Sequence, residues 1–178
     1  METMSNKMHW LNTTGGPFVC GDAAVAELWR GIYGSSGPSG PTEQTDYERA
    51  CGVTNYLQSV PCGADQLVVL GDEPLQSALF INFRNETCIA RWVYSRSSDV
   101  NDFIFNADGL EEIEARIQIP LLSGWLVLFD SSTSLDKCEQ IAVSRMQISA
   151  GTYAITSEKA EHAKDKSFII HRFLRTNS

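Results

Sequence analysis

Apolar and polar residues alternate along much of this chain with the period of two that is typical of β-strands. The clearest alternation covers residues 112–119, where every second residue is apolar, so that one face is expected to be exposed to water. Residues 125–129 are apolar throughout, which indicates a strand in the middle of a sheet. The other runs that we predict to be strands cover residues 9–19, 56–60, 66–70, 78–83, 88–94, 140–148, 152–157 and 167–174.

Helical signals are short. Asp22 is placed to cap a helix that runs to about Gly31. The apolar residues of this segment share one stripe that must face a core, namely Val25, Leu28, Trp29 and Ile32. Thr45 and Glu48 have the spacing of a capping box, which predicts a second helix over residues 46–51.

Two polar segments are predicted to be loops. Residues 34–45 are rich in glycine, serine and proline and are expected to form a flexible surface loop. The charged stretch 158–166 is interpreted as a solvated hairpin loop between the last two strands. Asp99 is placed to cap a brief turn that runs through Phe105.

Together these elements predict a mainly β (α+β) fold, in which antiparallel sheets carry two or three short helices. Connections that contain proline and glycine join successive strands, as in hairpins, and the long helices that a parallel arrangement needs are missing. A chain of 178 residues is long enough to bury about 70% of its unfolded surface in one core. We therefore expect a single domain over residues 1–178.

The composition is that of a globular protein, with 43% hydrophobic and 20% charged residues. No apolar run approaches the roughly 20 residues that span a membrane. The first ten residues lack the apolar segment of a secretory signal, so a cytoplasmic location without membrane contact is expected. The net charge of -8 repels phosphate backbones and favours a basic partner, which argues against direct nucleic-acid binding.

Neither a metal site nor a cofactor is predicted. The three histidines do not fall at ligand spacing, and the five cysteines contain no C-x-x-C pair. An odd number of scattered cysteines in a chain of this size indicates reduced thiols rather than a disulfide framework. No glycine-rich loop has the pattern that cradles phosphates.

Two residue pairs invite a catalytic interpretation. Asp72 and Glu73 are adjacent carboxylates, but a turn that closes the preceding strand explains them better. Cys51 and His171 are the one nucleophile and base that would support an alternative function as a small hydrolase. No local motif surrounds Cys51, and a single cysteine in an amphipathic helix is typically a small core residue.

The tryptophans are candidates for the core or for an interface. Trp29 and Trp125 lie in apolar surroundings and are predicted to be core residues. Trp92 lies between Arg91 and Tyr94, which are residue types that concentrate binding energy in interfaces. A core position is nevertheless favoured for Trp92.

One group of residues carries a resemblance to a known family. It consists of Trp10, Gly15, Gly16, Pro17, Asp46, Tyr47, Gly71, Asp72, Glu73, Pro74, Arg91, Trp92 and Tyr94. Their arrangement over residues 10–94 resembles the immunity protein 21 family, small antidotes encoded beside the toxins of bacterial polymorphic toxin systems. The second half of the chain matches this family only loosely.

The resemblance implies a β-rich protein without catalytic activity, which binds a cognate toxin domain and neutralises it by occluding its active site or substrate groove. It also implies that the motif residues hold the fold and that the toxin contacts lie elsewhere. A non-catalytic structural or adaptor subunit is a further alternative, since an acidic β domain can bind many partners.

The predicted toxin contacts are acidic. Six acids fall within residues 99–114 with no base between them, a pattern that is typical of a solvated face. The same pattern suits a surface that attracts a basic toxin. The predicted steering residues are Asp108, Glu111, Glu112 and Glu114.

Overall fold

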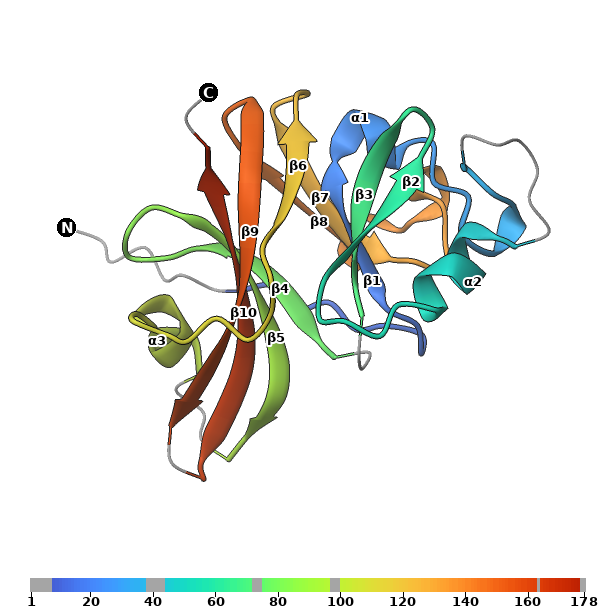
Figure 1. Cartoon of the computed structure of the whole chain (residues 1–178). Coiled ribbons are helices and arrows are strands. Elements are labelled where there is room, and N and C mark those ends of the chain that lie inside the picture. Colours follow the sequence, from blue (N-terminus) through green and yellow to red (C-terminus); the bar gives the residue numbers. More distant parts are fainter. Residues whose placement is uncertain (1–7, 38–43, 72–74, 97–99, 163, 177–178) are drawn as a thin grey trace.

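Two antiparallel β-sheets pack face to face in the computed structural model, which describes residues 8–37, 44–71, 75–96, 100–162 and 164–176 (Figure 1). The first sheet contains, from edge to edge, β2 (Gln58–Cys62), β3 (Asp65–Leu70), β1 (Phe18–Asp22), β7 (Trp125–Asp130) and β8 (Val143–Gln147). The second sheet contains β4 (Ser77–Ile81), β5 (Thr87–Ser95), β10 (Lys166–Arg175), β9 (Gly151–His162) and β6 (Ile117–Leu121). The predicted mainly β, antiparallel fold is confirmed.

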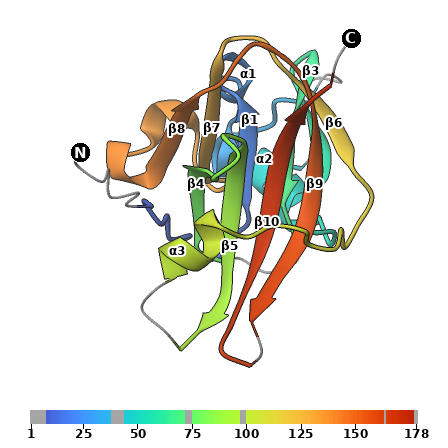
Figure 2. The ribbon, with the colours of Figure 1, turned by 90° about the vertical axis from the view of Figure 1, so that its left-hand side faces the viewer.

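Short helices cover the outer faces of both sheets. α1 (Ala23–Ala26) and α2 (Asp46–Cys51) lie against the first sheet. α3 (Val100–Phe105) lies against the second sheet, on the opposite side of the molecule (Figures 1 and 2). The described residues also contain the 3-10 turns η1 (Gly31–Tyr33), η2 (Leu135–Lys137) and η3 (Gln140–Ala142).

The central strands bury both of their faces. In β3, Val68 and Leu70 point into the space between the sheets, whereas Leu67 and Val69 point toward the helices. On β7, Leu128 points into the space between the sheets and Phe129 points toward the helices. A strand that is covered on both sides has no wet face, which explains why these segments are apolar at successive positions.

α1 is shorter than predicted. Asp22 does cap it, and its carboxylate accepts the free N–H of Ala24 at 2.9 Å. The helix ends at Ala26, and a turn closed by the bond from the Leu28 N–H to the Val25 carbonyl at 3.0 Å follows it. Leu28 and Ile32 lie beyond the helix and are 43% and 52% exposed, so the predicted buried stripe is wrong for both residues.

α2 follows the prediction. The Thr45 hydroxyl accepts the Glu48 N–H at 3.2 Å, and the Glu48 carboxylate accepts the Thr45 N–H at 2.7 Å. These two bonds form the capping box that the sequence spacing predicts. Residues 38–43 of the predicted loop 34–45 lie outside the described residues, as does Asp99, the predicted cap of the turn that forms α3.

The strand predicted over residues 112–119 is wrong for its first five residues. β6 begins only at Ile117, and upstream of it the pairing is an isolated bridge between Glu112 and Glu158. Glu112 forms an ion pair with Arg116, and the Glu114 side chain turns inward. Backbone bonds from the Ile113 N–H to the Ser157 carbonyl and from the Lys159 N–H to the Glu111 carbonyl flank this bridge, and the ladder is interrupted between it and Ile117.

Three other strands begin later than predicted. The strand predicted over residues 56–60 begins at Gln58. The segment predicted over residues 9–19 pairs regularly only from Phe18, and upstream of it Leu11 forms an isolated bridge with Ser77. The segment predicted over residues 140–148 opens with the turn η3 and becomes a strand at Val143.

β9 and β10 form a longer hairpin than predicted, because the charged stretch 158–166 is mostly strand instead of solvated loop. Glu158 and Lys166 are only 7% and 6% exposed. Arg172 on β10 donates to the Glu158 carboxylate at 2.8 Å, and Lys166 Nζ lies 5.1 Å from the centre of the Phe103 ring. Charged residues can occupy buried strand positions when such partners lie beside them.

Replacing Arg172 by methionine is expected to lower the free energy of unfolding by about 3–5 kcal/mol. The Arg172 guanidinium bonds to Glu158, to Glu86 at 3.1 Å and to the Ala107 carbonyl at 2.9 Å. Methionine keeps most of the volume but leaves two carboxylates without their cation. Urea unfolding measures the difference.

The matched control is Arg116→Met, which breaks the exposed ion pair between Arg116 and Glu112. Exposed pairs contribute little, so this variant should unfold almost as the wild type does. A loss for Arg172→Met no larger than that of the control would contradict the importance of the buried pair.

Candidate functional site

The acidic residues predicted to contact the toxin do not form one uniform surface. Asp108 is ion-paired with Arg84, and Glu112 with Arg116, so each of these carboxylates is partly neutralised. Hydrogen bonds from Arg116 also lower the pKa of Glu112. Glu111 is exposed, and no ion pair involving it is found in the described part of the chain.

Glu114 differs from these three residues because it is half-buried and bonded inward. One carboxylate oxygen accepts the Ser157 hydroxyl at 2.6 Å, and the other accepts the Tyr56 N–H at 3.1 Å. Glu114 therefore joins the segment before β6 to β9 and to the loop that precedes β2.

Arg91 reaches the same loop from β5, in the second sheet. Its side chain is 1% exposed and donates to the Gly71 carbonyl at 2.6 Å and to the Tyr56 carbonyl at 3.3 Å. The Gly71 N–H in turn bonds to the Tyr56 carbonyl at 3.1 Å. We call Arg91, Glu114, Ser157 and His171 the buried polar network.

His171 is the innermost member of this network. Its Nδ1 lies 3.0 Å from the Ser157 hydroxyl oxygen. Because that hydroxyl donates to Glu114, Nδ1 must carry the proton and donate to Ser157. Burial, and secondly the positive charge of Arg91, hold the pKa of His171 well below its usual 6.5, so the ring is neutral at pH 7.

The structure does not bring Cys51 and His171 together. Cys51 is exposed on α2, at the outer side of the first sheet, whereas His171 is wholly buried on β10 (Figure 1). The Cys51 thiol interacts with Tyr47 in its own helix, and His171 with Ser157. The interpretation of Cys51 as a core residue is wrong, because Ala50 takes the buried position.

Two glycines of the family motif are required by close contacts. A Cβ atom on Gly16 would lie 2.4 Å from the Tyr47 ring, and one on Gly71 would lie 2.4 Å from atoms of the segment 53–55. Gly15 has a φ of 120°, which favours glycine at that position. The contact between Gly16 and Tyr47 also brings two separate parts of the motif together.

Asp46, another motif residue, is completely buried. Its carboxylate accepts the backbone N–H groups of Arg30 and Ser36, each at 2.8 Å, and pairs with the Arg49 side chain. A single carboxylate thus fixes the residue before η1, the start of the segment 34–45 and the helix α2.

The aromatic motif residues pack on the outer face of the second sheet. The Trp92 ring meets Trp10 and Phe168 edge-on, with centroids 5.3 and 5.4 Å away. Tyr94 is 37% exposed, and its hydroxyl lies 3.5 Å from the Glu161 carboxylate. Trp92 therefore packs against the core beneath α3, as its favoured interpretation expected.

The rest of the motif lies near strand ends. The Pro17 carbonyl accepts the Ser131 N–H at 3.1 Å, which joins the start of β1 to the end of β7. Asp72, Glu73 and Pro74 lie outside the described residues, so the turn predicted there stays a prediction. The contacts of the described motif residues support a role in holding the fold.

Trp125 is not the core residue that the sequence predicts. It is 47% exposed and begins β7 at one end of the strand. With Glu27 and Arg145 it lines a shallow cavity of about 350 Å³. Sequence reasoning missed Arg145, whose one signal is that it is a lone base in the predicted strand over residues 140–148.

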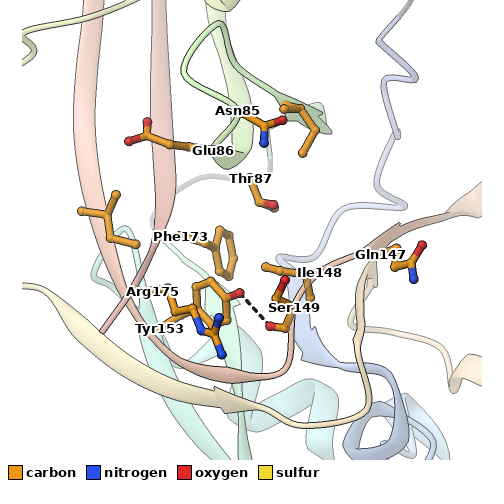
Figure 3. A pocket seen from close by; sticks show the side chains of 11 residues that line it. Asn85, Glu86, Thr87, Gln147, Ile148, Ser149, Tyr153, Phe173 and Arg175 are labelled. Atoms are coloured by element: carbon orange, nitrogen blue, oxygen red, sulfur yellow. Dashed lines mark hydrogen bonds between the residues drawn. The ribbon is translucent and has the colours of Figure 1, made fainter. Parts of the chain in front are cut away.

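A cavity of about 470 Å³ opens where the two sheets meet, between the β4–β5 turn and the end of β8 (Figure 3). Phe173 and Ile148 contribute apolar surface, and the Tyr153 hydroxyl donates to the Ser149 carbonyl at 2.7 Å. The carboxylate of Glu86 at its border is already bonded to an arginine and an asparagine. The lining therefore suits the binding of a side chain better than acid–base chemistry.

In the described residues no group of three or more histidine, cysteine, aspartate or glutamate side chains is arranged to hold a metal ion. The five cysteines are free thiols. Burial raises the pKa of Cys88 to about 12, so this thiol is not an activated nucleophile.

A comparison with models of known protein families establishes the family of this chain. A family model described as "Immunity protein 21" matches residues 9–166. The chain belongs to the immunity protein 21 family. The match of the immunity protein 21 model extends far beyond residues 10–94, where the sequence motif lies, and covers β1 through β9. No curated protein and no solved structure matches the chain.

Membership in the immunity protein 21 family gives this chain the role of an immunity protein, whose partner is a cognate toxin. Such families are generally non-catalytic. In the part of the chain that the structure describes, every helix is too short or too polar to cross a membrane.

Gly71→Ala is expected to lower the free energy of unfolding by about 1–3 kcal/mol, because the new methyl group must displace the segment 53–55 or the Arg91 contact. Gly52→Ala is the control, since a Cβ there meets nothing closer than 3.4 Å and φ is -76°. Thermal and urea unfolding compare the two variants. Equal stability would show that the close packing at Gly71 is not required.

Stability should fall at acidic pH through His171. Its pKa is lowered in the folded state, so below about pH 6.5 the unfolded state binds the additional proton. The contribution of His171 to the free energy of unfolding is therefore fully present above about pH 7. As the pH falls toward the pKa of the folded state, this contribution decreases by about 1.4 kcal/mol per pH unit. Urea unfolding between about pH 8 and 5 measures this slope.

His171→Gln should reduce the dependence of the free energy of unfolding on pH. His162→Gln replaces an exposed histidine on β9 and should leave this dependence unchanged. Identical slopes in the wild type and in His171→Gln would contradict the assignment of a neutral buried ring.

Proposed function

We propose that the protein binds a cognate toxin domain directly and neutralises it by covering the active site or substrate groove of the toxin. The observation that carries the proposal is the family match over residues 9–166. The separation of Cys51 from His171 supports a mechanism without catalysis. Inhibition then depends on the affinity and geometry of binding alone.

The charge of the chain favours a basic toxin. With a net charge of -8, the protein attracts a positively charged partner, and opposite fields raise association rates by roughly 10 to 1,000-fold. A toxin that acts on a phosphate backbone has a basic substrate groove. The acidic protein would be drawn toward that groove, which is the surface to be covered.

The steering surface that we propose consists of Asp108, Glu111 and Glu112. Glu111 contributes most to it, because Asp108 and Glu112 each face an arginine. Glu114 supports these residues from behind, since its carboxylate is held by Ser157 and by the Tyr56 N–H. Steering acts at a distance, so these residues need not be the ones that are buried in the complex.

The double variant Glu111→Lys, Glu112→Lys is expected to associate more slowly with the toxin domain encoded beside this gene, by about tenfold at low salt. The wild type should lose the same advantage as salt rises, because screening removes the attraction. Stopped-flow association at several salt concentrations, together with an assay of toxin activity, measures both effects.

The matched control is Asp65→Lys, Glu139→Lys, which changes the net charge equally at two other exposed positions. If both double variants slow association equally, the net charge of the protein explains the effect and the proposed steering surface is wrong. If the wild type neither binds nor inhibits the toxin domain, the proposed function fails.

A further inference from the structure

The outer strands of the two sheets differ in whether another strand can pair with them. In an antiparallel ladder the backbone groups of alternate residues point toward the neighbouring strand or away from it. The register of each pair therefore identifies the edge residues whose N–H and C=O groups point outward. The four outer strands are β2 and β8 in the first sheet and β4 and β6 in the second.

The edge at β2 is closed. The bond from the Gly71 N–H to the Tyr56 carbonyl, together with the register of β2 and β3, places Pro61 among the outward residues. Pro61 has no N–H, and its carbonyl accepts a bond from Arg49 at 3.0 Å. Proline on an outer strand prevents further pairing.

The edges at β6 and β4 are closed in different ways. On β6, Pro120 lacks the outward N–H, and the Gln118 carbonyl accepts the Gln66 side chain at 2.9 Å. On β4, Ser77 and Leu11 exchange two backbone bonds of 2.8 and 3.2 Å. The residues 77–80 of β4 are all buried, so their backbone groups are not accessible to another chain.

The edge at β8 is open. The Ile148 N–H bonds to the Gly124 carbonyl at 3.0 Å. The register of β7 and β8 then directs the backbone of Met146 toward β7 and that of Arg145 and Gln147 outward. Arg145 and Gln147 are exposed, and no hydrogen bond joins these outward groups to the described part of the chain.

Side chains suited to an interface stand beside this open edge. Trp125 and Arg145 line the shallow cavity on the outer face of the first sheet. In the described residues Arg145 takes part in no ion pair. On the other face, Ile148 borders the cavity between the two sheets (Figure 3). Exposed tryptophan and arginine are the residue types that dominate binding energy in interfaces.

We propose that a strand of the toxin domain pairs with β8 and extends the first sheet, with an acidic or uncharged polar residue opposite Arg145. The inference rests on the proposed function and names the surface through which it acts. The backbone groups of Arg145 and Gln147 supply main-chain hydrogen bonds, and the two neighbouring cavities receive side chains from alternate positions of the added strand.

Charge distinguishes the toxin from a second copy of this chain as the occupant. Two copies of β8, paired antiparallel about Arg145, would place each Arg145 directly opposite the other, and like charges in that position are destabilising. A different chain can present an acid there. The unpaired arginine in an otherwise acidic protein therefore favours pairing with a foreign strand.

Amide hydrogen exchange tests the proposal residue by residue, with the toxin domain encoded beside this gene as the probe. In the free protein the amides of Arg145 and Gln147 should exchange rapidly, whereas that of Met146 is protected by its bond to β7. In the complex both rapid amides should slow by about 100-fold or more, because each is now hydrogen-bonded. This alternating pattern is specific to strand addition.

Proline variants give an independent test. Gln147→Pro removes an outward N–H in the way that Pro61 and Pro120 do, and should raise the dissociation constant by roughly tenfold or more. Ser59→Pro is the matched control, since Ser59 points outward on β2, an edge already closed by Pro61. Thermal unfolding of the free variants establishes that both are folded.

The outcomes separate this inference from the proposed function. A complex in which the Arg145 and Gln147 amides still exchange rapidly overturns docking at β8 and leaves the proposed function standing. Protection that rises with protein concentration in the absence of toxin overturns the toxin as occupant and identifies a second copy. Absence of any complex overturns the proposed function and, with it, this inference.

Discussion

The packing of the two sheets depends on how Arg91 satisfies the backbone of the loops that end the first sheet. The Tyr56 and Gly71 carbonyls face this buried arginine, and the Tyr56 N–H faces Glu114. A buried polar group without a partner costs about 1–3 kcal/mol. An apolar residue in place of Arg91 would leave the Gly71 carbonyl without this donor, whereas the Tyr56 carbonyl would keep its bond from the Gly71 N–H. The guanidinium therefore ties the second sheet to the end of β3 in the first. Hydrophobic contacts between the sheets add to the packing around this bond.

The residues that contact the interior of the fold and those that we propose to face the toxin lie in different parts of the molecule. Asp46, Gly71 and Arg91 act inside it, through contacts with backbone groups that any change would leave unsatisfied or crowded. Glu111 and Arg145 are exposed and free of ion pairs in the described residues. Substitutions at such exposed positions cost little stability. An immunity protein of this design can change its binding surface while the buried contacts keep the fold.

Sequence periodicity predicted most strands and the capping box at Thr45, because both depend on residues close in the chain. It failed where a distant partner decides the outcome. Glu158 and Lys166 look solvated until Arg172 and the Phe103 ring are placed beside them. The alternation at residues 112–116 predicts a strand, but the ladder is interrupted between the bridge at Glu112 and Ile117. Whether another strand can pair with β8 depends on the order of the strands in the sheet and on burial, and neither follows from a local sequence pattern.

The position of β1 in the first sheet has a consequence for the synthesis of the protein. β1 lies between β3 and β7, although β7 comes more than a hundred residues later in the chain. On the ribosome β1 can pair with β3 early, but its other side stays unpaired until β7 emerges. An unpaired apolar strand in a nascent chain is prone to pair with other chains. The antidote therefore cannot complete its first sheet, or present a finished β8 edge, until most of its length has been translated.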